Sequence, residues 1–144
     1  MTDTATDLTL TVTRLIKADP KRLYDAWLDP KMISRFMRPD ADVTIPQATN
    51  DPREGGRFDI LMQAGDKQIP HAGTYLELRP HERIVFTWES PFSTDGSTVT
   101  LAFSPEGDAT RVTLTHVKFA SEEMRDNHEK GWGGILDALQ AEFA

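Results

Sequence analysis

Residues 121–143 read SEEMRDNHEKGWGGILDALQAEF, and this stretch decides the fold. Ser121 is a favourable helix N-cap, and Glu122 and Glu123 follow it at the positive end of the helix dipole. Apolar residues and one histidine then recur every three or four positions, at Met124, His128, Trp132, Ile135, Leu136, Leu139 and Phe143. The spacing predicts one long amphipathic helix with a single buried face.

Three glycines, Gly131, Gly133 and Gly134, interrupt the interior of this predicted helix. A glycine in a helix interior costs about 1 kcal/mol relative to alanine, so three in four positions need a reason. Gly131 and Gly134 would let the helix backbone approach the sheet or the short helices closely. Alternatively, the glycines leave volume for a ligand or allow a bend. We favour close packing.

The N-terminal part predicts a strand and two short helices. Residues 8–16 alternate apolar side chains with threonine, a pattern typical of a half-buried strand. Asp19-Pro20 and Asp29-Pro30 each combine an N-cap with proline at the first helical position. These pairs predict one helix over 20–28 and a second from residue 30 through Met37.

The middle of the chain predicts an antiparallel meander. Strand patterns occur at 42–45, 57–62, 74–78, 83–89, 99–103 and 112–116. Tight turns are expected at Ala64–Lys67 and at Asp95-Gly96, and Pro46 is expected to end the first of these strands. Short strands joined by tight turns favour antiparallel pairing over β-α-β units. The stretch 46–56 is the most loop-like and is a candidate lid.

Length and composition set limits on the kind of protein. The 144 residues fit one domain spanning 1–144. The absence of cysteine excludes disulfides, thiolate catalysis and zinc–sulfur sites, and it favours a cytoplasmic location. The first seven residues lack the basic and apolar regions of a signal peptide, and no apolar stretch is long enough for a membrane span.

The charge balance argues against nucleic-acid binding. The formal net charge is −7 and the isoelectric point is about 5.0. Arginines in the stretch 35–57 alternate with acidic residues, so they form no basic patch. A surface of this kind repels phosphate backbones.

Several segments together resemble a known superfamily. They are Ala18-Asp19-Pro20, Gly55-Gly56-Arg57-Phe58, and residues 73–80, 83–88, 110–116 and 128–132. The chain resembles the START-like, or Bet v 1-like, helix-grip superfamily, and within it the bacterial group related to the C-terminal domain of the Hsp90 ATPase activator. The resemblance implies an α+β fold in which a curved antiparallel sheet of six or seven strands surrounds a long C-terminal helix. Two short helices follow the first strand.

The resemblance implies a cavity between the sheet and the terminal helix, because the superfamily includes lipid carriers, hormone and polyketide binders, and aromatase/cyclases. Aromatic and methionine side chains suit the lining of an irregular apolar pocket. The candidate ligand-binding residues are Trp27, Met32, Phe36, Phe58, Ile60, Met62, Phe86, Trp88, Leu101, Phe103, Leu114, His116, His128, Trp132, Ile135, Leu136 and Leu139. Most of them are also expected to pack the core.

His116 and His128 are the candidates for a catalytic base, because each lies on a predicted apolar face. A hydrogen-bonded structural role is the commoner one for such a residue, so we assign no catalytic residue. Arg14, Tyr75 and Arg111 are polar groups that could reach a pocket mouth. The histidines lack metal-ligand spacing, so we expect neither a metal nor another cofactor.

Three hypotheses for the function follow. The first is a binding module for a small apolar or aromatic molecule. The second is an enzyme of the cyclase or hydrolase kind with a pocket histidine as base, and the third is a cochaperone-type interaction domain with a collapsed pocket. The Hsp90 activator has a separate N-terminal domain that this sequence lacks, so we expect no chaperone partner. A homodimer is left open.

Overall fold

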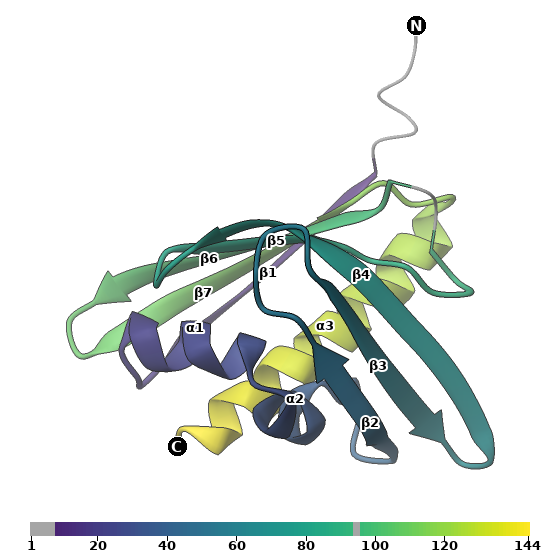
Figure 1. Cartoon of the computed structure of the whole chain (residues 1–144), viewed down its shortest axis with the longest axis horizontal. Coiled ribbons are helices and arrows are strands. Elements are labelled where there is room, and N and C mark those ends of the chain that lie inside the picture. Colours follow the sequence, from purple (N-terminus) through teal and green to yellow (C-terminus); the bar gives the residue numbers. More distant parts are fainter. Residues whose placement is uncertain (1–7, 94–95) are drawn as a thin grey trace, which may run out of the picture.

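The computed structural model of the chain describes residues 8–93 and 96–144 (Figure 1). Seven strands and three helices follow one another along this part of the chain. They are β1 (Thr9–Ile16), α1 (Pro20–Leu28), α2 (Pro30–Phe36), β2 (Val43–Asn50), β3 (Arg57–Ala64), β4 (Lys67–Arg79), β5 (Arg83–Thr87), β6 (Thr98–Glu106), β7 (Ala109–Val117) and α3 (Glu122–Glu142). This order confirms the predicted α+β architecture.

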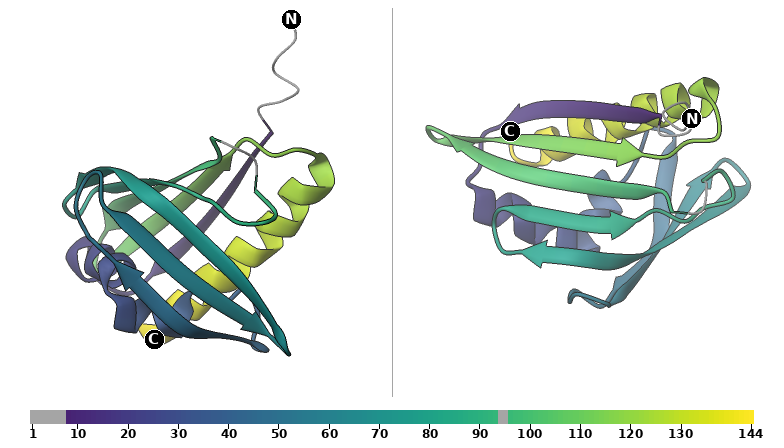
Figure 2. Two further views of the ribbon diagram at one scale, coloured as in Figure 1. Left: turned by 45° about the vertical axis from the view of Figure 1, so that its right-hand side comes forward. Right: turned by 90° about the horizontal axis from the view of Figure 1, so that it is seen from above.

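The strands form one curved antiparallel sheet in the order β1-β7-β6-β5-β4-β3-β2. Figure 2 shows α3 crossing the concave side of this sheet, with α1 and α2 near the C-terminal end of α3. Trp132, Leu136 and Leu139 of α3 are buried against the sheet. The helix-grip arrangement expected from the terminal stripe is therefore confirmed.

The helix starts behave as the Asp-Pro pairs predict. The Asp19 carboxylate accepts a hydrogen bond from the Arg22 backbone N–H across 2.9 Å at the start of α1. The Asp29 residue both ends α1 and caps α2, where its carboxylate accepts from the Lys31 N–H across 2.9 Å. The Ser121 hydroxyl accepts from the Met124 N–H in the same way at the start of α3.

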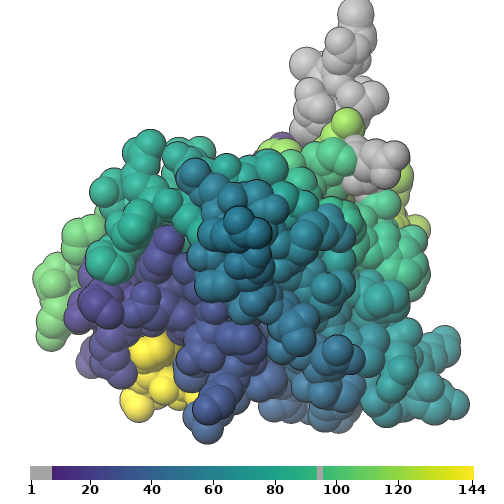
Figure 3. All heavy atoms as spheres, in the orientation of Figure 1, coloured from purple at the N-terminus to yellow at the C-terminus, as the bar shows by residue number. Residues whose placement is uncertain are grey.

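The two short helices and the end of α3 meet at one end of the molecule. The guanidinium of Arg22 in α1 lies 5.0 Å from the ring centroid of Phe143, just beyond α3. In Figure 3 the last residues of the chain, coloured yellow, lie at the surface beside the purple and blue atoms of this region. The helices therefore close this end of the space between α3 and the sheet.

The strand predictions were furthest from the structure in the bounds of β2 and β4. β2 continues to Asn50 instead of ending at Pro46, because it is the edge strand and a bulge between Thr44 and Gln47 accommodates the proline. The first part of the candidate lid is therefore strand. β4 begins at Lys67, seven residues earlier than predicted.

The turns agree with the predictions where the structure describes them. Ala64 pairs with Lys67, and Gly65 has a φ of 66°, so β3 and β4 form the predicted hairpin. Gly96 also has a positive φ of 85°. The other residue of that predicted turn, Asp95, lies outside the described residues, as do residues 1–7.

Candidate functional site

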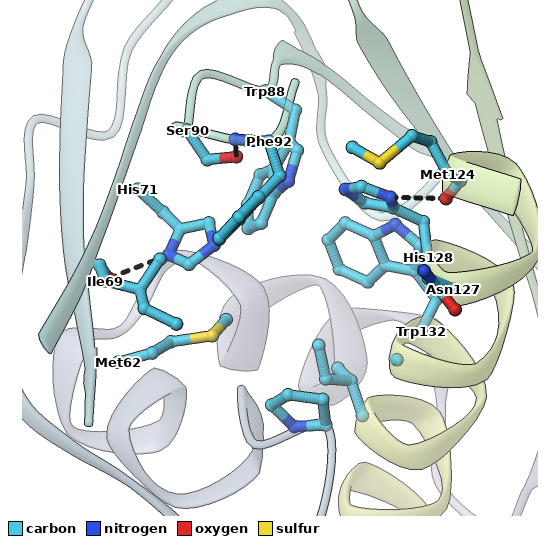
Figure 4. A pocket seen from close by; sticks show the side chains of 13 residues that line it. Met62, Ile69, His71, Trp88, Ser90, Phe92, Met124, Asn127, His128 and Trp132 are labelled. Atoms are coloured by element: carbon cyan, nitrogen blue, oxygen red, sulfur yellow. Dashed lines mark hydrogen bonds between the residues drawn. The ribbon is translucent and has the colours of Figure 1, made fainter. Parts of the chain in front are cut away.

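A cavity of about 340 Å³ lies between the sheet and α3 (Figure 4). Its lining comes from β3, β4, the segment after β5, the segment after α2, and one face of α3. The lining residues are Pro39, Met62, Ile69, His71, Trp88, Ser90, Phe92, Met124, Asn127, His128, Gly131, Trp132 and Ile135. Most of these side chains are apolar, and none is a lysine, an arginine or a carboxylate.

The sheet side of the cavity depends on the register of β3 and β4. Met62 pairs with Ile69, and Ile60 pairs with His71, so alternate residues of both strands face α3. Beyond them, a Cβ on Gly73 would lie 2.0 Å from the Thr87 carbonyl oxygen. A glycine is therefore required where β4 passes close to the end of β5.

The helix side of the cavity is the middle of the apolar stripe. Met124, His128, Trp132 and Ile135 are spaced by four, four and three residues, so they lie on one face of α3. Trp132 lies 4.8 Å from Trp88, which follows β5 directly, measured between ring centroids. These two indoles form a continuous aromatic wall at the inner end of the cavity.

The glycines of α3 have different surroundings. A Cβ on Gly134 would lie 2.0 Å from the carbonyl oxygen of Pro39, so this glycine allows the segment after α2 to contact the helix backbone. That contact supports the close-packing interpretation. A Cβ on Gly131 would meet Pro39 only at 3.5 Å, and Gly131 lines the cavity. Gly131 therefore leaves volume, as the alternative interpretation held.

His116 lies behind Trp132, outside the cavity lining, and is fully buried. Its Nδ1 accepts a hydrogen bond from the Trp132 Nε1–H across 2.9 Å, so its Nε2 carries the proton and donates to the Ser97 hydroxyl. Burial, together with the smaller effect of the nearby His128, lowers the pKa of His116 to about 3. His116 is thus a neutral residue with both nitrogens bonded, which is poorly suited to act as a base.

Two other histidines line the cavity, His128 from α3 and His71 from β4. Each Nδ1 is bonded to a backbone carbonyl, of Met124 across 2.8 Å for His128 and of Ile69 across 3.1 Å for His71. Burial is the main reason that the pKa of His71 is lowered to about 4; the bond to Ile69 opposes this shift, and the nearby His128 adds to it. The His71 ring also lies 4.9 Å from that of Trp88, which limits its movement.

The predicted ligand-binding residues fall into three groups. Five of them line the cavity: Met62, Trp88, His128, Trp132 and Ile135. Four more, together with Trp88, surround a void of about 10 Å³ nearer to α1 and α2: Trp27, Phe58, Ile60 and Phe86. The others line neither space. Met32 is partly buried against the core, and the remaining residues belong to the packed interior: Phe36, Leu101, Phe103, Leu114, His116, Leu136 and Leu139.

The candidate polar groups at the pocket mouth are engaged elsewhere. Arg14 forms an ion pair of 2.7 Å with Asp137 beside a groove between β1 and α3. Arg111 pairs with Glu106 across 2.6 Å, and the Tyr75 hydroxyl accepts a hydrogen bond from Asn50. None of the three predicted residues is part of the cavity lining.

The sequence analysis did not identify several lining residues: Pro39, Ile69, His71, Ser90, Phe92, Met124, Asn127 and Gly131 were not proposed as ligand-binding. A signal for His71 was present, because Ile69, His71, Gly73 and Tyr75 alternate along the true β4. In residues 8–93 and 96–144 no cluster of three or more metal-ligating side chains occurs. None of the helices described is both long and apolar enough to cross a membrane.

A curved antiparallel sheet around a terminal helix, with an apolar cavity between them, defines a helix-grip protein. The chain belongs to the family described as Activator of Hsp90 ATPase homolog 1-like protein, whose model matches residues 17–144. This match confirms the resemblance found in the sequence. The comparison with curated proteins gave no match.

Solved structures of bacterial proteins share the fold over almost the whole chain. Protein CV1439 from Chromobacterium violaceum is 25% identical, with a TM-score of 0.83 over 94% of this chain and 96% of that chain. The AHSA1-like protein from Aeromonas hydrophila is 26% identical, with a TM-score of 0.81 over 93% and 90%. Mll3558 from Rhizobium loti is 28% identical, with a TM-score of 0.78 over 94% and 96%.

Proposed function

We propose that the protein binds a small apolar molecule in the cavity between β4 and α3. The observation that carries this proposal is the cavity itself, whose volume of about 340 Å³ falls in the range of roughly 300–1,000 Å³ typical of ligand sites. Two tryptophans, two methionines and two isoleucines supply apolar surface for a guest. Phe92 is 53% exposed at this site, and a ligand would cover part of its ring.

Apolar burial supplies enough free energy for such binding. Removal of roughly 300 Å² of ligand surface from water contributes about 7 kcal/mol at 25 cal/mol per Å². The costs of association reduce this value, so micromolar affinity is a reasonable expectation. The interaction-domain hypothesis required a collapsed pocket and gains no support from the open cavity.

An enzyme with a pocket histidine as base is the second candidate. The observation in its favour is that His71 and His128 both line the cavity. His71 is a weak base, because burial lowers its pKa to about 4. A proton-transfer role would therefore fall to His128, with the cavity holding the substrate beside it.

The binding proposal can be tested by filling the cavity from the helix side. The probe is prodan, a neutral naphthalene dye whose emission reports an apolar environment. In Gly131→Leu the new side chain occupies the cavity, and Gly133→Leu is the matched control. Gly133 lies in the same helix, but its Cβ would face Arg14 and not the cavity.

The parent protein and Gly133→Leu should shift prodan emission to shorter wavelengths and bind it with similar affinity. Gly131→Leu should weaken binding at least tenfold while remaining folded by circular dichroism. The same three proteins should be examined by native mass spectrometry for a small molecule retained from the cell. Equal prodan binding by all three proteins, or none by the parent, would contradict the proposed site.

A further inference from the structure

Two of the polar side chains in the cavity have a fixed hydrogen-bonding character. His71 and His128 lie on opposite sides of it, on β4 and α3, and Figure 4 shows both rings directed into the space between these elements. The Nδ1 atom of each ring is bonded to a carbonyl oxygen of its own element, Ile69 or Met124. A carbonyl oxygen can only accept, so Nδ1 carries the proton in both rings.

The opposite nitrogen of each ring is therefore a hydrogen-bond acceptor. A neutral imidazole has one N–H, and with that hydrogen on Nδ1 the Nε2 atom retains its lone pair. The desolvation that lowers the pKa of His71 to about 4 keeps that ring neutral near neutral pH. No residue in 8–93 or 96–144 bonds to Nε2 of either histidine.

Neighbouring aromatic rings restrict the movement of both histidines. The His128 ring lies 5.2 Å from Phe119 and 5.5 Å, at a right angle, from His116. The His71 ring lies 4.9 Å from Trp88. Because the rings are packed and their Nδ1 atoms are bonded, neither histidine can turn to offer a donor without losing these contacts.

The other polar groups at the cavity do not change its preference for a ligand with a hydrogen-bond donor. Ser90 and Asn127 can each donate and accept, so they do not distinguish ligand types. No lysine or arginine lines the cavity, and the chain has a net charge of −7. A buried carboxylate would meet two lone pairs and no cation, which is an expensive arrangement.

We infer that the cavity selects apolar molecules that carry a hydroxyl or N–H donor, which would bond to Nε2 of His71 or His128, and that it disfavours carboxylates such as fatty acids. This inference rests on the proposed function and deepens it by naming the ligand class. The apolar body of the ligand would lie against Trp88 and Trp132. The donor would provide orientation and selectivity.

Three naphthalenes of nearly equal shape test the inference: 2-naphthol, 2-methoxynaphthalene and 2-naphthoate. Affinities are measured by isothermal titration calorimetry at pH 8, where an imidazole is neutral. We expect 2-naphthol to bind about fivefold more tightly than its methyl ether, as one net hydrogen bond implies. The carboxylate should bind more weakly than either.

The variants His71→Phe and His128→Phe assign the acceptor. In at least one of them the preference for 2-naphthol over its methyl ether should approach one. The ratio is measured within each variant, so general damage to the cavity cancels. His81→Asn is the control, because His81 lies outside the cavity lining and asparagine tolerates its positive φ of 68°.

The outcomes separate the two proposals. Equal binding of the alcohol and the ether, or tightest binding of the carboxylate, would overturn the inference and leave apolar ligand binding intact. A preference for 2-naphthol that survives in both histidine variants would also overturn it. Failure of all three compounds to bind the parent would contradict the proposed function itself.

Discussion

Trp132 donates a hydrogen bond from its indole nitrogen to Nδ1 of His116, 2.9 Å away in the core. The His116 Nε2–H in turn donates to the Ser97 hydroxyl. This chain of bonds connects α3 to β7 and to Ser97, the residue before β6, directly behind the cavity wall. A polar network so deeply buried fixes the orientation of Trp132 only while every member keeps its partner.

A comparison of two buried tryptophans separates the contribution of this hydrogen bond to stability from the contribution of packing. Trp27 and Trp132 are 4% and 2% exposed, but the Trp27 Nε1 has no hydrogen-bond partner among the described residues. Trp132→Phe leaves the His116 Nδ1 without a donor, whereas Trp27→Phe removes an unpaired donor. We expect Trp132→Phe to lower the free energy of unfolding by about 1–3 kcal/mol more than Trp27→Phe. Urea unfolding at pH 7.5 measures both, and equal losses would contradict a stabilising role for the bond.

Stability should fall in mild acid because two histidines are held neutral. The pKa of His116 is lowered to about 3 and that of His71 to about 4, against 6.5 for an ordinary histidine. Below pH 6.5 the unfolded chain therefore binds protons that the folded chain does not bind. The free energy of unfolding should decrease as the pH falls, with a slope approaching 1.4 kcal/mol per pH unit for each histidine.

Urea unfolding between pH 7.5 and pH 5 measures this slope above the range in which carboxylates titrate. His116→Gln replaces the imidazole with an amide that can still accept and donate but does not titrate. This variant should lose about half of the slope. An unchanged slope in His116→Gln would show that the buried imidazole is not the source of the acid sensitivity.

Patterns of neighbouring residues predicted most of the fold, because helix caps and buried helix faces depend on residues that are close together in the sequence. The spacing from Met124 to Phe143 marks a buried helix face, and the Asp19 and Asp29 caps mark helix starts. Pro46 was misleading, because it appears to end a strand but lies on the edge strand, where a bulge accommodates it. The structure has a second proline inside a strand. Pro70 lies where β4 pairs with β3 alone.

The candidate site was predicted less completely, because the lining depends on contacts between distant segments. Because β4 was predicted to begin at residue 74, His71 was left outside it. The position of His71 at the cavity follows from its pairing with Ile60. His116 was proposed from its apolar strand face, but the indole of Trp132 separates it from the cavity. The sequence pattern places His116 and Trp132 on buried faces of two different elements. It does not indicate which of the two side chains lies nearer to the cavity.

Gly134 should be intolerant of alanine, whereas its neighbour Gly133 should accept it. A Cβ at residue 134 would lie 2.0 Å from the backbone oxygen of Pro39, but at residue 133 it would lie 3.5 Å from the flexible Arg14 guanidinium. We expect Gly134→Ala to lose about 1–3 kcal/mol through overpacking. Gly133→Ala should gain up to about 1 kcal/mol from helix propensity. Thermal and urea unfolding of the two variants measure this difference. Similar stabilities of Gly134→Ala and Gly133→Ala would rule out the close contact at Pro39.

Ligand entry should change the emission of the two cavity tryptophans and leave the third unaffected. Trp88 and Trp132 line the cavity, whereas Trp27 borders the separate small void. The probe is 2-decalol, a saturated bicyclic alcohol that neither absorbs nor emits with tryptophan. In Trp27→Phe, addition of 2-decalol should move the emission to shorter wavelengths as water leaves the cavity. In Trp88→Phe/Trp132→Phe only Trp27 emits, and its spectrum should stay constant. An equal shift of emission in this double variant would place the bound alcohol outside the cavity. Unchanged emission in a Trp27→Phe variant that binds the alcohol by calorimetry would lead to the same conclusion.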